Sequence, residues 1–166
     1  MTDSDQSTST ETAGVNPLLA GLDGDARLTR EGAQTAIDQH PFLSWLDVRV
    51  EAVADGRVVL AVPHHDRLCN TAFGADTIHG GVTATLVDTI GAFALYATVE
   101  DLASLEMATT DLNVSYMRPA TGRLEAEGTV LRAGNSMGVV DVTITSETDG
   151  DRVESSHGRV SYRLFR

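Results

Sequence analysis

The amino-acid sequence predicts an α+β fold, in which an antiparallel sheet wraps around one long central helix. Three observations lead to this prediction. An apolar segment with helical character covers residues 81–98, two segments with the alternation of β-strands precede it, and four such segments follow it in hairpin order. Local patterning of this kind specifies the fold class and no finer topology.

The amino-terminal part of the chain is predicted to lack a stable structure. Residues 1–28 are acidic, and the first of them are mainly Ser, Thr, Asp and Glu. A segment with so little apolar content is expected to be disordered or poorly ordered. Residues 29–166 are expected to form a single domain. It begins with a helix over Thr29–Gln39, which Thr29 caps and which has a weak apolar face of Ala33, Ala36 and Ile37.

The segments on either side of the central helix are assigned from their alternation and their turn residues. After an apolar turn formed by Phe42, Leu43, Trp45 and Leu46, which should pack against the main body, a hairpin with an Asp-Gly turn is expected. A loop follows over His64–Thr77. The six predicted strands are Val48–Ala54, Arg57–Pro63, Met107–Arg118, Arg123–Ala133, Met137–Thr148 and Asp151–Leu164.

The predicted central helix, Gly81–Thr98, is apolar on every side and carries one charged residue. Such a helix is expected to be buried. Its single charge is Asp88, near the middle of the segment. An ionised carboxylate in a core is costly unless it is paired, hydrogen-bonded or used in a reaction. Asp88 is therefore either satisfied by its neighbours or catalytic, and both interpretations stay open at this point.

The residues that lead into this helix, His79-Gly80-Gly81, favour a catalytic interpretation. Glycine lets a ligand approach the backbone closely. The first amides of a helix have no partner within the helix, and the helix dipole is positive there. Such a helix start suits an anion or a developing oxyanion. The simpler alternative is that the two glycines only form a tight turn.

The spacing between these two features has a geometric consequence. Asp88 follows Gly80 by eight residues, which is about 12 Å along a helix axis. A short Asp side chain cannot span this distance. If both residues act on one carbonyl, they must come from two copies of the helix that lie antiparallel. The spacing therefore predicts a dimer with two shared sites.

Two stretches of the sequence resemble a known family. They are HGGVTATLVDTIGAFAL and, later, TTDLNVSYMRPATG. Together they closely resemble the PaaI-type acyl-CoA thioesterases of the hotdog fold, over roughly Leu43 to Tyr162. A glycine pair alone would be weak evidence, but an Asp nine residues after the His and the later Asp-Leu-Asn-Val-Ser-Tyr-Met-Arg-Pro-Ala segment make the combination specific.

The resemblance implies a hotdog fold and roles for the residues around the helix start. Asp88 would act as a general base on water or as a nucleophile. The amide of Gly80 would polarise the thioester carbonyl, and Gly81 beside it would contact the substrate. His79 would lie by the thioester and orient or polarise it. The alternative for His79 is a structural role in the turn, and the sequence favours neither.

Six further residues are candidates for the site, with less support. Asn70 lies nine residues before His79, whereas the family's active-site Asn often lies six before it, so the intervening loop is longer here. Thr109 matches a residue that helps hold the attacking water, and it is preferred to Thr110. Phe73 is a candidate for the wall of the acyl pocket, together with Tyr96 and Met117. Arg118 is a candidate for contact with coenzyme A phosphates.

The composition bounds the function further. The net charge is −12, from 24 acidic and 12 basic residues, and every basic residue is Arg. An acidic surface without Lys resembles the proteins of salt-loving microbes, so we expect a halophilic archaeal source; the alternative is an ordinary acidic protein. The charge bears on solubility and not on chemistry. It argues against a nucleic-acid partner, since the chain has no basic stripe.

Cysteine and histidine usage indicates a protein without a disulfide or a metal. Cys69 is the only cysteine, so it cannot form an internal disulfide, and we expect it to be a bystander. His64 and His65 lie together but have no second cluster of ligands. The amino end lacks the regions of a signal peptide, and the apolar helix is a poor membrane span. We therefore expect a cytoplasmic protein with no metal, no cofactor and no membrane partner.

These observations lead to one main functional hypothesis and two others. The main hypothesis is an acyl-CoA thioesterase that works as a homodimer or as a homotetramer of paired dimers. The second is a non-catalytic acyl-CoA binding or sensing protein on the same fold, which would not need Asp88. The third is a hotdog dehydratase, which would usually carry a different arrangement of His and Asp. The acyl group itself is not specified by the sequence.

Overall fold

The computed structural model describes residues 27–70, 76–148 and 150–166. The candidate residue Phe73 lies outside these ranges, as does most of the segment 1–28, so the predictions for both stay untested. The described elements, in chain order, are α1 (Arg30–Gln39), α2 (Pro41–Trp45), β1 (Arg49–Ala54), β2 (Arg57–Val62), η2 (Asp66–Leu68), α3 (Gly80–Tyr96), η4 (Leu102–Ser104), β3 (Glu106–Tyr116), β4 (Leu124–Ala133), β5 (Met137–Thr148) and β6 (Asp151–Phe165).

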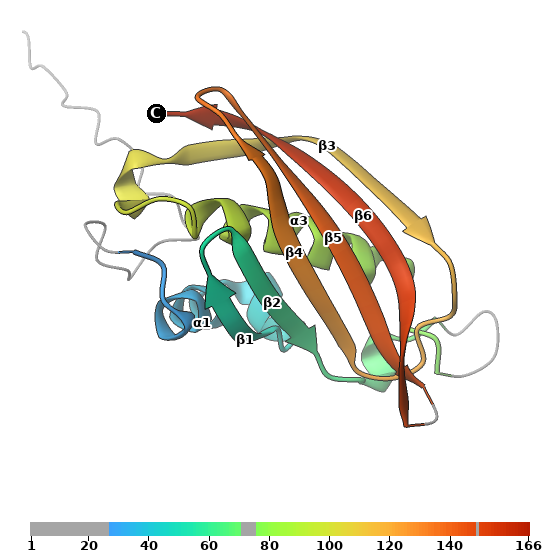
Figure 1. Ribbon diagram of the computed structural model, residues 1–166. Helices are drawn as coiled ribbons and strands as arrows, with labels where there is room; N and C mark the ends of the chain where they lie inside the picture. The colour runs from blue at the N-terminus through green and yellow to red at the C-terminus, as the bar shows by residue number, and fades with distance from the viewer. Residues whose placement is uncertain (1–26, 71–75, 149) are drawn as a thin grey trace, which may run out of the picture.

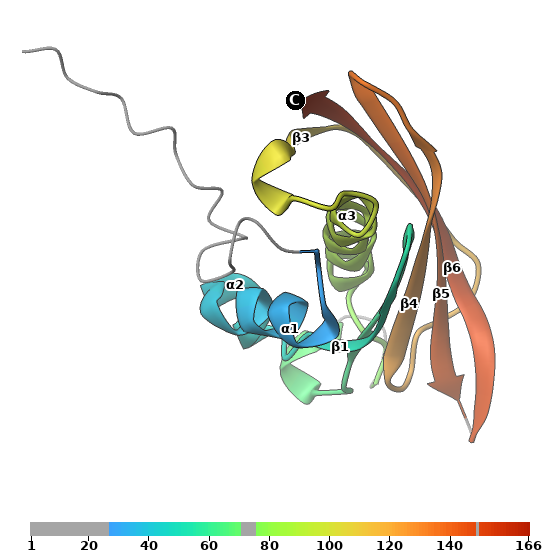
Figure 2. The same ribbon diagram turned by 60° about the vertical axis from the view of Figure 1, so that its left-hand side comes forward.

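The six strands form one antiparallel sheet that curves around α3. Its strand order is β1-β2-β4-β5-β6-β3, and every neighbouring pair is antiparallel. Figure 1 shows the sheet bending over α3, and Figure 2 shows α3 nearly end-on against its concave side, with α1 and α2 beside it. The predicted α+β fold with a sheet around a central helix is therefore confirmed.

The order of the strands differs from the sequence-based expectation at one point. Four consecutive hairpin strands were expected after the helix, but β3 pairs with β6 and not with β4. The chain crosses from the end of β3 to β4, which pairs with β2 and β5. The alternation of a strand shows which of its residues face the core. It does not depend on which strand lies next to it, so it cannot specify this crossover.

The core lies between α3 and the concave face of the sheet. Strand β5 alternates almost perfectly between buried and less buried residues, and its buried side chains face α3. Close packing requires a glycine on the helix: a Cβ added at Gly91 would lie 2.4 Å from Val160 Cγ1 and 2.8 Å from the Tyr162 hydroxyl oxygen. Gly91 therefore lets β6 approach this turn of α3 closely.

Helix α3 is not buried on every side, which corrects the expectation from its apolar composition. It begins at Gly80 and ends at Tyr96, close to the predicted bounds. Most of its residues are buried, but Ala84, Thr85, Asp88 and Ala92 are only partly buried. The sheet covers one side of the helix, and α1 and α2 cover only part of the other. The partly open side carries the one charged residue.

The two short helices before β1 agree in part with the prediction. The side chain of Thr29 accepts a hydrogen bond from the Gly32 amide at 3.0 Å, so Thr29 caps α1 as expected. The predicted apolar face of α1 is buried. The apolar cluster that follows forms α2; Leu43 and Leu46 are buried, but Phe42 and Trp45 are about half exposed. The predicted turn is thus a short helix whose two Leu side chains are buried against the body, while its two aromatic side chains are buried on one side only.

Candidate active site

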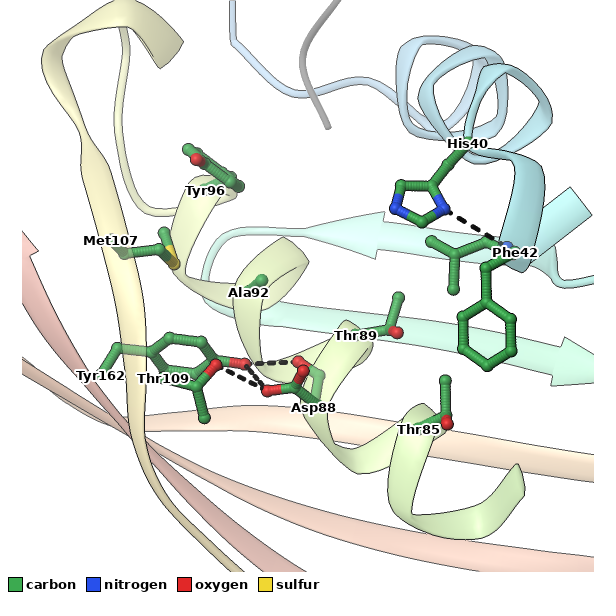
Figure 3. Close-up of a pocket in the computed structure, with 11 residues that line it drawn as sticks. His40, Phe42, Thr85, Asp88, Thr89, Ala92, Tyr96, Met107, Thr109 and Tyr162 are labelled. Carbon is green, nitrogen blue, oxygen red and sulfur yellow. Dashed lines mark hydrogen bonds between the residues drawn. The ribbon is translucent and has the colours of Figure 1, made fainter. Parts of the chain in front are cut away.

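Asp88 lies at the open side of α3, where it lines a hollow of about 340 Å³. The carboxylate is half-buried and not part of a closed core, which corrects the sequence-based expectation. The hydroxyl of Thr109, on β3, donates a hydrogen bond to Asp88 Oδ1 at 2.8 Å (Figure 3). This bond holds one carboxylate oxygen. No described residue donates a hydrogen bond to the other, Oδ2.

Tyr162, on β6, is a second partner of Asp88 and was not identified from the sequence. Its hydroxyl donates to the main-chain oxygen of Asp88 and lies 3.3 Å from Oδ1 (Figure 3). Burial and, after it, the charge of Asp88 raise the pKa of the Tyr162 phenol, so the hydroxyl stays protonated and able to donate. The contact joins two residues that are 74 positions apart in the sequence, so local sequence patterns do not indicate it.

The choice between two neighbouring threonines agrees with the sequence-based preference. Thr109 contacts Asp88, whereas the hydroxyl of Thr110 donates to the main-chain oxygen of Ser161 at 3.1 Å. The register of β3 against β6 shifts between Thr109 and Asp111. The structure therefore brings Thr109 to the candidate site and directs Thr110 elsewhere.

At the amino end of α3, His79 caps the helix. Its Nδ1 accepts a hydrogen bond from the Gly81 amide at 2.9 Å, and its main-chain oxygen accepts one from Val82. The amide of Gly80 has no acceptor among the described residues. The structural role considered for His79 is thus present, and its exposed ring is also open to solvent. Of the two glycine amides, the cap leaves that of Gly80 available to a ligand.

Tyr116, at the end of β3, covers Gly80 and was also not identified from the sequence. Its hydroxyl donates to the main-chain oxygen of Gly80 at 2.8 Å. A Cβ added at Gly80 would lie 3.1 to 3.3 Å from atoms of the Tyr116 ring, which is tight. Glycine at this position therefore lets the aromatic ring lie directly on the helix start.

Asn70 lies beside the helix start despite its unusual distance along the chain. Its main-chain N–H donates to the main-chain oxygen of Thr77 at 2.7 Å, and Cys69 pairs with Ile78 in an isolated bridge. This pairing holds the two flanks of the loop together, whatever the number of residues between them. Asn70 and Gly80 line the same hollow, of about 520 Å³.

Arg118 lines that hollow as well. Its guanidinium donates to the main-chain oxygen of Glu154 at 2.8 Å, and the side chain is exposed. Met117 lies in the same hollow, whereas Tyr96, its companion in the predicted acyl pocket, lines the hollow of Asp88. Within one chain, these two candidates for the wall of the acyl pocket therefore line different hollows.

The hollows at Asp88 and at Gly80 have no lining residue in common. Both residues lie on one straight helix, eight residues apart, which corresponds to about 12 Å along its axis. Within one chain, the carboxylate and the unpartnered amide cannot reach the same atom. The two halves of the candidate site are therefore separate in a single copy of the chain.

Within the ranges that the structure describes, the other reactive side chains do not form a competing site. Among the described residues, no three of His, Cys, Asp and Glu are placed to hold a metal ion. His64 Nε2 lies 3.2 Å from Cys69 Sγ, and His65 Nε2 lies 3.3 Å from Asp47. Burial raises the pKa of the Cys69 thiol, with smaller contributions from nearby carboxylates. A raised thiol pKa lowers the fraction of thiolate, which makes Cys69 a poor nucleophile.

Comparisons with known proteins identify the family. A family model described as the thioesterase superfamily matches residues 75–153, a range that contains His79, Gly80, Asp88 and Thr109. A Halobacterium salinarum protein, provisionally named an esterase, is 40% identical over 151 residues, which are 89% of this chain and 99% of the relative. The chain belongs to the thioesterase superfamily. This membership supports thioester hydrolysis as its general activity.

Two vertebrate proteins named as acyl-coenzyme A thioesterases are also similar to this chain. Acyl-coenzyme A thioesterase 13 of Homo sapiens is 30% identical over 105 residues, which cover 62% of this chain and 71% of the relative. The protein of the same name from Mus musculus is 37% identical over 76 residues, which cover 45% and 52% respectively.

Solved structures of thioesterases share the fold. A thioesterase from Haemophilus influenzae has a TM-score of 0.74 at 20% identity, covering 86% of this chain and 94% of its own. A thioesterase family protein from Silicibacter pomeroyi has a TM-score of 0.72 at 20% identity, and the match covers 80% of this chain and 94% of that protein's chain. The hotdog fold expected from the resemblance is thereby confirmed. Within the described residues, no helix is long and apolar enough to cross a membrane.

Proposed function

We propose that this chain hydrolyses acyl-CoA thioesters to a free acid and coenzyme A. The observation that carries the proposal is the pairing of two features on one helix. A half-buried carboxylate, Asp88, is held by Thr109 and leaves one oxygen directed to a hollow, and the amide of Gly80 has no acceptor among the described residues. A base and an oxyanion donor are the two groups that thioester hydrolysis needs.

In the proposed reaction, the Gly80 amide donates a hydrogen bond to the thioester carbonyl oxygen. Asp88 accepts a proton from a water molecule as that water attacks the carbonyl carbon. The negative charge that forms on the carbonyl oxygen is stabilised by the amide and the positive end of the helix dipole. The tetrahedral intermediate then loses the thiolate as its C–S bond breaks, and the proton on Asp88 passes to the sulfur. A second route, in which Asp88 attacks and forms a mixed anhydride, uses the same groups.

The proposed site is shared between two copies of the chain, because one copy separates Asp88 from Gly80. Strand β3 is the candidate contact. It is an edge strand, it is exposed along most of its length, and Leu112 and Tyr116 on it are 40% and 56% exposed. Long unpaired edge strands are prone to pair with another chain. Antiparallel pairing of two β3 strands would also lay two copies of α3 antiparallel, as the shared site requires.

In the shared site, coenzyme A is assigned to the side of Gly80. Arg118 and Asn70 line that hollow, and Arg suits phosphate groups. His79 would orient the thioester from its exposed position, and Gly81 would border it. These assignments, like those of Asp88 and Thr109, remain proposals.

The source and setting of the protein are proposed from composition. The −12 net charge and the absence of Lys favour a halophilic source, and the relative from Halobacterium salinarum is consistent with it. The cytoplasmic location, the PaaI-type subgroup and the tetramer stay predictions from the sequence.

The direct test is release of free thiol from a panel of acyl-CoAs at high salt, with Asp88→Asn as the critical variant. The amide has nearly the same size but cannot accept the proton, so turnover should fall by about 10² to 10⁴-fold. Asp151→Asn makes the same change at the exposed first residue of β6 and should leave the rate unchanged. A non-catalytic acyl-CoA sensor would bind the panel without releasing thiol. An Asp88→Asn rate close to that of the original protein would contradict the proposed mechanism.

A further inference from the structure

The hollow beside Asp88 has the form of a pocket for the acyl group. Its floor is α3. One wall comes from the turn between α1 and α2, and the other from β3 and β6 (Figure 3). Its volume of about 340 Å³ is at the lower end of the range found for small-molecule sites.

The helix face along the floor changes from small to large residues. Asp88, Ala92 and Tyr96 follow one another at intervals of four residues, so they lie in a row on one face of α3. Ala92 is partly buried and leaves room one turn beyond the carboxylate. Tyr96 is fully buried and fills the space at the next turn. The floor is therefore open next to Asp88 and closed about 12 Å further along.

The chemistry of the lining fits an acyl chain and not coenzyme A. Phe42, Leu43 and Met107 add apolar surface to the walls, and no Arg lines the hollow. His40 is used structurally: its Nδ1 accepts a hydrogen bond from the Leu43 amide, at 3.4 Å, where α2 begins. Phosphates need cationic partners, whereas an alkyl or single-ring group needs only apolar surface.

We infer that this hollow binds the acyl group, that Ala92 sets its width and Tyr96 its end, and that the substrates are therefore short- to medium-chain or single-ring acyl thioesters. This inference rests on the proposed function. An extended chain advances by about 1.2 Å per backbone bond, as in an extended peptide. The ~12 Å from Asp88 to Tyr96 thus admits roughly ten bonds. Longer chains exceed the pocket.

The critical experiment measures kcat/KM over a series of straight-chain acyl-CoAs, from two to sixteen carbons. The original protein should show a maximum at or below about ten carbons, because longer chains exceed the ~12 Å floor. Ala92→Leu fills the middle of the floor and should lower kcat/KM for the longest accepted chains at least tenfold, since each methylene excluded from an apolar site costs about fourfold. Acetyl-CoA, which ends before Ala92, should be hydrolysed at nearly the original rate.

The matched control is Ala103→Leu. Ala103 is exposed on η4, and it lines neither the hollow of Asp88 nor that of Gly80. The substitution adds the same volume away from the hollow and from β3, and it should leave the chain-length profile unchanged. The inference would be overturned if Ala92→Leu lowered kcat/KM by the same factor for every chain length. It would also be overturned if the control variant changed the chain-length profile as much as Ala92→Leu does. If the partner subunit fills the hollow, Ala92→Leu would disturb the site for every substrate and would give the equal loss at all chain lengths.

A binding measurement separates the inference from the proposed function. S-alkyl-CoA thioethers have no carbonyl and cannot be hydrolysed, so their affinity reports on the pocket alone. Ala92→Leu should weaken binding of octyl-CoA thioether about tenfold and leave ethyl-CoA thioether unchanged. If no acyl-CoA is hydrolysed but this difference is found, the proposed reaction is wrong and the pocket assignment holds. If hydrolysis occurs but Ala92→Leu changes the affinity for both thioethers by the same factor, the pocket assignment is wrong.

Discussion

The amino end and the middle of α3 offer two different kinds of functional group. At the amino end, the ligand-facing group is the main-chain amide of Gly80, and its neighbours His79 and Tyr116 hold the backbone that carries it. In the middle of the helix, the group is the side chain of Asp88, which Thr109 holds. A backbone amide is a fixed donor with a constant dipole, whereas a carboxylate can take up and release a proton.

The difference between the two regions explains why both are needed and why one chain is not enough. Thioester hydrolysis requires charge stabilisation at the carbonyl oxygen and proton transfer at the attacking water. The helix start supplies the first and the helix middle the second. Since the two open into separate hollows, the proposed site is complete only when a second copy brings its own α3 alongside.

The largest expected effect at the amino end comes from removing the amide itself. Gly80→Pro lacks the N–H group but suits the first position of a helix, and the extended conformation of His79 is compatible with a following proline. The variant should lose about 10² to 10³-fold in kcat, as is typical for one oxyanion donor.

Gly80→Ala is the matched control for this change. It adds the same close Cβ contact with the Tyr116 ring, which is exposed and can move, and it keeps the amide. Its rate should remain within a few-fold of the original. Equal losses in both variants would mean that packing against Tyr116, and not the amide, accounts for the effect.

A smaller effect is expected in the middle of the helix when the support of Asp88 is removed. Thr109→Val has a similar shape but no hydroxyl to donate to Oδ1, and hydrogen bonds to charged groups contribute about 1.5 to 3 kcal/mol. We expect kcat to fall by about tenfold to a hundredfold, with little change in KM. Thr109→Ser restores a donor and should recover most of the rate. A rate for Thr109→Val equal to that of the original would remove Thr109 from the site.

The sequence predicted one of these regions better than the other. The helix start follows from local chemistry, because two glycines after a histidine leave amides free at the end of an apolar helix. The support of Asp88 does not follow from local chemistry, since Tyr162 lies 74 residues away along the chain and meets Asp88 only through the strand order β5-β6-β3. Tyr116 was missed for the same reason, being 36 residues from Gly80.

The fold shows a similar division. Alternation located all six strands, and the apolar segment located α3 to within two residues at each end. Neither pattern specifies which strands are neighbours, so the position of β3 at the sheet edge was not predicted. The degree of burial of Asp88 was overestimated because a helical wheel does not show which side another element will cover.

The smallest expected effect is that of salt concentration on the stability of the whole protein, and it is not specific to the amino end or the middle of α3. Twelve excess negative charges repel one another, and screening weakens as the Debye length grows from about 3 Å at 1 M to about 30 Å at 0.01 M salt. The melting temperature should therefore fall as salt is lowered, and the assembly should loosen in light scattering. An unchanged melting temperature across this range would count against the halophilic interpretation.

The most direct test of the shared site mixes two inactive variants, Asp88→Asn and Gly80→Pro, after reversible dissociation. A heterodimer of the two contains one site with both original residues and one site with neither. Random exchange makes half of the dimers mixed, so activity should return to about one quarter of the original rate. Light scattering of each variant alone should show a folded dimer. If labelled subunits demonstrably exchange and no activity returns, Asp88 and Gly80 do not serve the same thioester, and the two-subunit site is wrong.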